Sequence, residues 1–214
     1  MSVDNQPRSD TDLDIASRHI DFRAYDEKKS WPPEKWLDLY INEGLRIIPL
    51  YGAHDAADYN PKKPGYSKWQ KYVPNRSELV DAIHLGRMWG CVCGSVSGNL
   101  SVVDYDLDET LGTREKAMSW RKENIPLLRS LRTLVTFTPS GGFHVWLRTE
   151  KPRPDPELIA QVTRLIPLEM DLVQGEARQV IVPPSKLKGV GNYWFMDDSK
   201  IRRTGRLGIR LIYC

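Results

Sequence analysis

The chain has 214 residues, of which 40% are hydrophobic and 28% are charged, and its formal net charge is +3. This composition is ordinary for a globular protein and excludes a globally disordered chain. Three cysteines exclude a disulfide framework, and no apolar stretch approaches the length of a membrane span, so we expect no membrane partner.

The amino-terminal segment is polar and carries little hydrophobic periodicity. We therefore predict a flexible arm over residues 1–29 and a folded domain over residues 30–214. Because the acidic start lacks the apolar run of a signal peptide, we expect a cytoplasmic protein. The chain ends in the strand-like sequence LGIRLIYC, which is compatible with a fragment of a longer protein.

Helix and strand signals alternate through the first half of the folded domain. The pattern predicts a helix from Pro33 to a stop at Gly44, a strand over residues 45–50 and a second helix capped by Ser77. The stretch WGCVCGSVSGNLSVVDYD then predicts two strands that pair as antiparallel neighbours across a Gly/Ser turn.

Residues 59–72, YNPKKPGYSKWQKY, alternate cations and aromatic side chains in a Pro/Gly loop. This composition suits contacts with phosphates and stacked bases, and Lys63 is the candidate for a nucleotide phosphate. The alternative is a solvated surface loop. We expect Trp69 to fill the core rather than to stack on a base.

Two carboxylates follow an apolar strand in LSVVDYDLD, residues 100–108. Side chains two residues apart in a strand point to the same face, so Leu100, Val102, Asp104 and Asp106 are expected to share one face. Same-face residues lie about 6.5–7 Å apart at Cα, close enough for both carboxylates to bind one divalent ion or a pair of ions. The alternative is a solvated strand end that enters an acidic loop.

The clearest hairpin signal is TLVTFTPSGGFHVWLR, residues 133–148, in which two apolar runs are separated by the turn sequence PSGG. In the second strand His144, Trp146 and Arg148 are expected to share one face. The opposite face of this strand is apolar and is expected to face the core.

A third isolated acid, Asp171, lies among apolar neighbours in a later predicted strand, and Arg178 begins the strand after it. Three carboxylates near a histidine and a glycine-rich turn are the arrangement that two-metal phosphoryl transfer requires. In that chemistry divalent ions activate the attacking hydroxyl and neutralise the leaving pyrophosphate.

The order of these segments resembles the bifunctional primase-polymerase (Prim-Pol) branch of the archaeo-eukaryotic primase superfamily. GLRIIPL with KKPGYSKW is similar to the family's opening strand and its Lys-x-Pro to Trp loop, and CVCGSVSGNLSVVDYDLDE resembles its first catalytic motif. TPSGGFHVWLR is similar to the second motif, and MDLVQGEARQVIVPPS with NYWF resembles the third. Each motif alone is weak, whereas four in the expected order are specific.

The resemblance implies roles for individual residues. Asp104, Asp106 and Asp171 are implied as catalytic ligands of Mg²⁺ or Mn²⁺, and His144 as a contact to the phosphates of the incoming nucleotide. Relatives often carry serine at the position of Gly142, so a hydroxyl contact would come from Ser140 instead. The further candidates for nucleotide binding are residues of the turn and three cations: Ser140, Gly141, Gly142, Arg148, Lys63 and Arg178.

The resemblance also implies a fold and partners for residues 30–214. We expect an α/β archaeo-eukaryotic primase fold, with a mixed, mainly antiparallel sheet in a core related to the RNA-recognition motif and a smaller amino-terminal α/β lobe. The implied activity is that of a DNA primase and DNA polymerase that adds NTPs or dNTPs on a single-stranded DNA template. Relatives are often fused to a helicase, so a fused or separate helicase is a candidate partner.

Two other classes of function remain open from the sequence. A metal-dependent nuclease would use the same acids to activate water, and it would cleave strands without a nucleotide triphosphate. A non-catalytic module that binds single-stranded DNA or a replication origin would bind DNA equally well without Asp104 and Asp106.

Overall fold

The structure is a computed structural model, and it describes residues 31–51, 60–154, 156–198, 200, 205–209 and 211–212. Internal contacts divide the chain into two units, Met1–Ser30 and Trp31–Cys214, and the second unit carries all of the described residues. The arm predicted over residues 1–29 lies outside them. No helix in the described part is long and apolar enough to span a bilayer.

The described residues form a mixed α/β fold. The helices are α1 (Pro33–Asn42), α2 (Arg76–His84), the 3₁₀ turn η4 (Ser95–Ser97), α3 (Leu107–Leu111), α4 (Arg114–Glu123), α5 (Ile125–Ser130) and α6 (Pro156–Leu165). The strands are β1 (Ile47–Pro49), β2 (Trp89–Val92), β3 (Leu100–Tyr105), β4 (Val135–Phe137), β5 (Phe143–Thr149), β6 (Asp171–Gln174), β7 (Gln179–Val182), β8 (Lys186–Leu187), β9 (Gly191–Asn192), β10 (Trp194–Phe195) and β11 (Leu211–Ile212).

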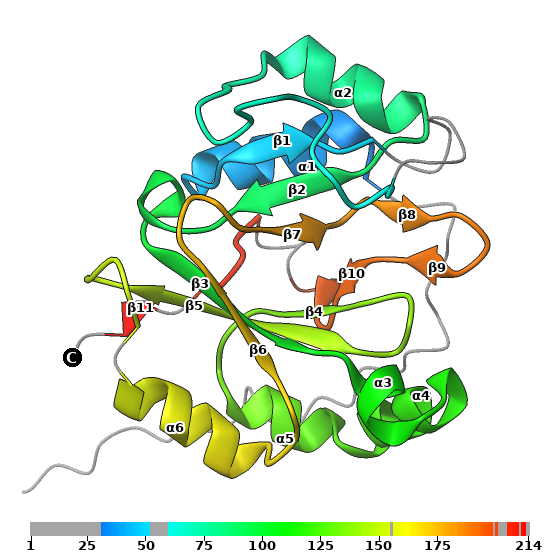
Figure 1. Cartoon of the computed structure of the whole chain (residues 1–214), viewed down its shortest axis with the longest axis vertical. Coiled ribbons are helices and arrows are strands. Elements are labelled where there is room, and N and C mark those ends of the chain that lie inside the picture. The colour runs from blue at the N-terminus through cyan, green and yellow to red at the C-terminus, as the bar shows by residue number, and fades with distance from the viewer. Residues whose placement is uncertain are drawn as a thin grey trace, which may run out of the picture. The chain divides into compact units, whose positions relative to one another are not determined.

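The strands form a large sheet, a small sheet and a two-stranded ribbon. The large sheet has the order β10-β4-β5-β3-β6, with β11 beside β5, and the small sheet has the order β1-β2-β7 (Figure 1). The ribbon pairs β8 with β9. The pairing of β11 with β5 is parallel, and the other strand pairs are antiparallel. The expected mixed, mainly antiparallel sheet is therefore confirmed.

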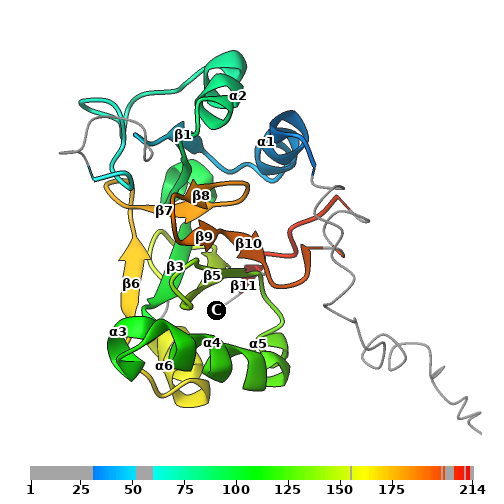
Figure 2. The ribbon, with the colours of Figure 1, turned by 90° about the vertical axis from the view of Figure 1, so that its right-hand side faces the viewer.

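The large sheet buries both of its faces. Helices α3 to α6 lie on one side, whereas α1, α2 and the small sheet lie on the other (Figure 2). On the helix side, alternate residues of β3 and β5, such as Val103 and Val145, pack against α4 to α6. On the opposite side Val102 and Trp146 belong to a cluster that also includes Trp36 of α1. The apolar period of two thus continues on both faces because each face is covered.

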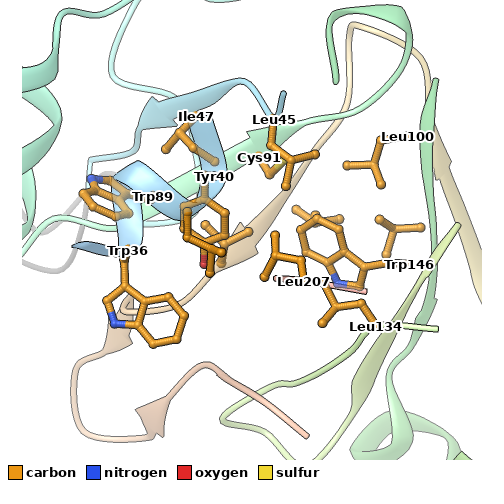
Figure 3. Close-up of a cluster of buried hydrophobic side chains, with 14 of the residues drawn as sticks. Trp36, Tyr40, Leu45, Ile47, Trp89, Cys91, Leu100, Leu134, Trp146 and Leu207 are labelled. Atoms are coloured by element: carbon orange, nitrogen blue, oxygen red, sulfur yellow. The ribbon is translucent and has the colours of Figure 1, made fainter. Parts of the chain in front are cut away.

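The second of these clusters joins the small sheet and α1 to the large sheet (Figure 3). Phe195 of β10 is its centre, because its ring lies 5.8 Å from Trp36, 6.3 Å from Trp146 and 6.4 Å from Tyr40, measured between centroids. The indole N–H of Trp146 also donates a hydrogen bond to Thr136 Oγ1 at 2.8 Å. These contacts hold the two sheets together, and the strand register places Phe195 in the same cross-strand row as His144 and Asp104.

Several predicted elements are confirmed, and two predictions are wrong. The hairpin of residues 133–148 forms as β4 and β5. Strands β2 and β3, predicted to be paired neighbours, belong to different sheets and share one isolated bridge, Gly94 to Leu100. The positive φ angles of Gly94 and Gly98, +83° and +66°, turn the chain from one sheet to the other. The α2 cap is Asn75, whose side chain accepts from Glu78 N, and not the predicted Ser77.

One hydrogen bond offers a test of the packing between α1 and the small sheet. Tyr40 donates its hydroxyl to the carbonyl oxygen of Pro183 at 2.6 Å, and both groups are buried. Tyr40→Phe leaves that carbonyl unsatisfied, so we expect the free energy of unfolding to fall by about 1–3 kcal/mol in urea denaturation. Ile41→Ala is the control, because Ile41 is 53% exposed, and its effect should stay within about 0.5 kcal/mol. An unchanged midpoint for Tyr40→Phe would contradict this account.

Candidate active site

Three strands of the large sheet place a histidine and two carboxylates in one row. Asp104 of β3 lies opposite His144 of β5 on one side and opposite Asp171 of β6 on the other. Directly opposed residues of antiparallel strands point to the same face, with Cβ atoms about 4.5–5.5 Å apart. The three side chains therefore share the face that looks toward the small sheet, just beyond the apolar cluster.

The centre of this row holds unsatisfied polar atoms. His144 Nε2 lies 3.3 Å from Asp104 Oδ1. Neither Asp104 Oδ1 nor His144 Nδ1 has a hydrogen-bond partner among the described residues, although both atoms are buried. Burial lowers the pKa of His144, and the nearby Asp104 opposes this effect only in part. The imidazole is therefore neutral near pH 7, and the buried Asp104 Oδ1 next to it has no hydrogen bond among the described residues.

Asp106 does not continue the strand as predicted. Strand β3 ends at Tyr105, and Asp106 is the N-cap of α3 with φ −84° and ψ 77°. The prediction that Asp104 and Asp106 share one face of a continuous strand is therefore wrong, because β3 ends between them and the chain turns into α3. The two carboxyl groups still interact: partial burial and the charges of Asp104 and Glu109 raise the pKa of Asp106 to about 6, while Lys62 acts in the opposite direction.

The carboxylates suit a divalent cation by their chemistry. Mg²⁺ and Mn²⁺ prefer carboxylate oxygens, and here the acids repel one another and Asp104 has a buried oxygen without a hydrogen bond among the described residues. Asp171 is exposed at the start of β6, on the edge of the large sheet. As the side chains stand, no three His, Cys, Asp or Glu residues of the described part are grouped closely enough to hold an ion.

The predicted phosphate turn lies between β4 and β5, beside the end of β3. A Cβ on Gly142 would lie 2.2 Å from the carbonyl oxygen of Tyr105, so only glycine permits this approach. Gly141 has φ +112°, and a Cβ there would lie 2.8 Å from that of Ala117. Ser140 Oγ lies 3.1 Å from Thr138 Oγ1. Both glycines are thus needed to place the turn next to the acids.

Two functional candidates were missed by the sequence reasoning. Lys62 acts electrostatically on both Asp106 and His144, and its carbonyl oxygen is held by Gln179 Nε2 at 3.0 Å. Tyr193 is buried, with its ring centroid 6.4 Å from that of His144. Burial and the charges of Asp104 and Asp106 raise its pKa. The lysine-rich loop was a signal for Lys62, whereas Tyr193 reaches the site only through the path of the ribbon β8–β9.

The structure does not bring the predicted Arg148 to the acids. Arg148 lies opposite Leu100, at the other end of β3 from Asp104. Its guanidinium donates to the carbonyl oxygen of Glu43 at 2.8 Å and packs on Gly98. The alternation along β5 predicts the correct face for Arg148, but Arg148 lies four residues along the strand from His144. Arg148 therefore joins the large sheet to the end of α1.

Lys63 and Arg178 are exposed cations in different places. Lys63 lies beside Lys62 in the loop, with its backbone carbonyl bound to Tyr51 N. Arg178 follows the turn after β6, and its carbonyl oxygen accepts from Cys93 N at 3.0 Å. Because β6 runs from Asp171 toward this turn, Arg178 lies beyond the far end of that strand. Lys63 and Arg178 both stay predictions for phosphate binding, and Arg178 follows the end of β6 that is opposite to Asp171.

Trp69 packs against the cluster that covers the outer face of the small sheet, together with Leu50 and Ile181. It therefore fills the core, as the sequence predicts, and leaves the lysines of its loop at the surface.

The comparisons with known proteins agree with the resemblance predicted from the motifs. A search among curated proteins finds no match. The model of the family described as Prim-Pol, bifunctional DNA primase/polymerase, N-terminal, matches residues 38–206. This match runs from the second half of α1 past β10, and it includes all three strands of the row and the turn beside them. The chain therefore belongs to the Prim-Pol family of bifunctional DNA primase/polymerase N-terminal domains.

Proposed function

We propose that this chain is a DNA primase and polymerase that adds NTPs or dNTPs to a primer or an initiating nucleotide on a single-stranded DNA template. Membership of the Prim-Pol family suggests this activity. The observation that carries the proposal is the row of His144, Asp104 and Asp171 on one face of adjacent strands. We further propose the archaeo-eukaryotic primase fold and a cytoplasmic location for the protein.

In this proposal Asp104, Asp106 and Asp171 hold two Mg²⁺ or Mn²⁺ ions. Bound ions would act as Lewis acids, stabilising the attacking 3′-oxygen and the charge that develops on the triphosphate. Asp104 would supply its buried Oδ1, which has no hydrogen bond among the described residues. Asp106 at the α3 cap and the exposed Asp171 would supply the other carboxylates.

The remaining groups act on the triphosphate. Once Asp104 serves as a ligand, the Nε2–H of His144 becomes available to a phosphate oxygen. The turn Ser140-Gly141-Gly142 brings backbone amides to the same place, and glycine lets a phosphate approach them closely. Lys62, with Lys63 beside it, adds positive charge on the side of the loop. In this arrangement the carboxylates would hold the metal ions. The backbone amides of the turn and the two lysines would hold the phosphates.

The acids of the row are tested by primer extension. Asp104→Asn and Asp171→Asn should each lower the rate of nucleotide addition by about 100-fold or more, the scale of removing one preorganised electrostatic group. Asp81→Asn on α2 is the matched control and should leave the rate unchanged. The assay uses a single-stranded template, a primer, labelled dNTPs or NTPs and Mn²⁺. Full activity in both variants, or strand cleavage without any nucleotide, would contradict the proposal, and the second result indicates a nuclease.

Asp106 links metal binding to stability. Its pKa is about 6 in the folded protein and about 3.9 in an unfolded chain. The folded state therefore keeps this proton longer, and stability is lost as pH rises from about 4 to 6. Asp106→Asn removes the buried charge, so its melting temperature should exceed that of the wild type at pH 8 and match it near pH 4.

Divalent cations give the reciprocal measurement for the same variant. Mn²⁺ added at pH 8 should raise the melting temperature of the wild-type protein, because a ligand that binds only the folded state stabilises it. The rise should be much smaller for Asp106→Asn and should also shrink as the pH falls below about 6. Equal rises in both proteins would show that Asp106 is not a ligand.

The structure indicates Lys62 as the phosphate-binding lysine, whereas the sequence predicts Lys63, and variants of the two residues distinguish these assignments. Lys62 acts on Asp106 and His144, whereas no such interaction is resolved for Lys63. Lys62→Gln should therefore raise the KM for the nucleotide by roughly tenfold with a smaller change in kcat, the size of about one charge-assisted hydrogen bond. Lys63→Gln is the matched control and should have the weaker effect. The reverse order would return the role to Lys63.

A further inference from the structure

An exposed patch lies around the outer side of the β4–β5 turn. It combines a cation with large apolar side chains: Arg114 and Met118 of α4, Val190 before β9, and Trp194 of β10. The exposed fractions of Met118, Val190 and Trp194 are 39%, 38% and 37%. Arg114 ties the patch together, because it donates to the carbonyl oxygens of Pro139 at 2.9 Å and Val190 at 3.2 Å. We call this set the turn-side patch.

A buried cation supports the aromatic member of the patch. The Arg121 guanidinium lies 4.4 Å from the Phe137 ring centroid and 5.2 Å from that of Trp194, so it contacts both rings, which pack edge to face with their centroids 6.2 Å apart. Arg121 is only 6% exposed. Its hydrogen bonds go to the carbonyl oxygens of Thr138 and Gly142, at 3.3 and 3.4 Å. The Trp194 ring is therefore held rigidly in front of a cation.

The patch carries positive charge without a matching anion. Within the described residues no carboxylate forms an ion pair with Arg114 or Arg121. Burial and the charge of Arg114 lower the pKa of Arg121 to about 10, so the two guanidinium groups repel each other. Arg114 uses two of its five N–H groups in the bonds above. An incoming anion would relieve this repulsion and find free donors.

An exposed indole beside uncompensated arginines has the chemistry that binds single-stranded nucleic acid. Every base has a face that stacks on an aromatic ring, and the backbone phosphates follow the cations. We propose that the turn-side patch binds single-stranded DNA, with a base stacked on Trp194 and a backbone phosphate bound to Arg114. This assignment rests on the proposed function, for which it names the surface that receives the strand.

The register of the large sheet places this patch at the same end as the acids. Trp194 lies opposite Phe137, Phe137 opposite Phe143, and Phe143 opposite Tyr105. Asp106 follows Tyr105 directly, and Tyr193, beside His144, directly precedes Trp194. The patch and the row of carboxylates thus lie on either side of the turn that we assign to the triphosphate. Trp194 shares the helix side of the sheet with Phe137, whereas the acids face the small sheet, so a strand held at Trp194 would pass around the end of the β4–β5 turn to reach them.

The test is the equilibrium binding of fluorescein-labelled oligothymidylate, measured by anisotropy in EDTA without nucleotide. Trp194→Ala should weaken binding about tenfold or more, because stacking of one base is lost. Trp194→Phe keeps an aromatic ring and should retain most of the affinity. Arg114→Gln should weaken binding and reduce the slope of log K against log salt by about 0.7, the value for one phosphate contact to a single strand.

The controls lie on α6, away from the patch. Arg164→Gln removes an exposed arginine that pairs with Glu157 at 3.0 Å, and Leu165→Ala removes a side chain that is 47% exposed. Both variants should bind oligothymidylate like the wild type. Circular dichroism establishes folding, and photo-crosslinking of bromodeoxyuridine in the oligonucleotide should label Trp194 in the wild-type protein, which gives an answer even if Trp194→Ala does not fold.

Two results would overturn the assignment of the patch. One is an unchanged affinity in both Trp194→Ala and Arg114→Gln, and the other is an equal loss in the α6 controls. Primer extension separates this outcome from failure of the proposed function. Wild-type protein that binds oligothymidylate through the patch but extends no primer refutes the activity alone, whereas extension with unchanged template affinity in the patch variants refutes the patch alone.

Discussion

The hydrogen-bond register of β5, β3 and β6 is the constraint on which the rest of the site depends. Antiparallel pairing places His144, Asp104 and Asp171 side by side, although they are far apart in the chain. A slip of one residue in either pair would turn one side chain to the opposite face. Val102 and Trp146 form the neighbouring pair on the same face of β3 and β5. They oppose such a slip, because it would remove them from the apolar cluster between the sheets.

The packing that fixes this register directly adjoins the polar groups, because Phe195 lies in the same cross-strand row as His144 and Asp104. Phe195, Trp146 and Trp36 close the space between α1 and the large sheet. Beside this cluster the same face carries the carboxylates, the histidine and Tyr193. The sheet is therefore a rigid support whose apolar half sets the position of its polar half. Helices α3 to α6 cover the reverse face and anchor the turn through Ala117.

Charges that are not balanced within the described residues lie on both sides of the turn. On one side burial and the charges of Asp104 and Glu109 raise the pKa of Asp106, which favours the binding of a cation. On the other side Arg121 is buried against two aromatic rings without an ion pair to a carboxylate among the described residues, close to Arg114. Each arrangement costs stability in the isolated protein and favours a ligand of opposite charge. The separation of the two signs suits a reaction that brings metal ions, a triphosphate and a nucleic acid strand together.

Much of the local structure follows from the sequence by itself, because it depends on neighbours in the chain. The period of two in residues 133–148 predicts the hairpin, the PSGG sequence its turn, and the order of the motifs the family. The three acids and His144 could be singled out for the same reason, since an ionisable residue in an apolar strand is visible without coordinates. The face of the sheet on which His144 lies also follows from alternation.

Only the tertiary structure decides which of these residues meet. The turn into α3 removes Asp106 from the strand, and two glycines with positive φ send β2 and β3 into different sheets. Arg148 lies on the predicted face but at the wrong end, where Glu43 binds it. Lys62 and Tyr193 join the site, and Trp194 meets Arg121, through chain paths that local patterns do not encode. Periodicity determines the face of a side chain, whereas long-range strand pairing determines its position along the sheet and its partners.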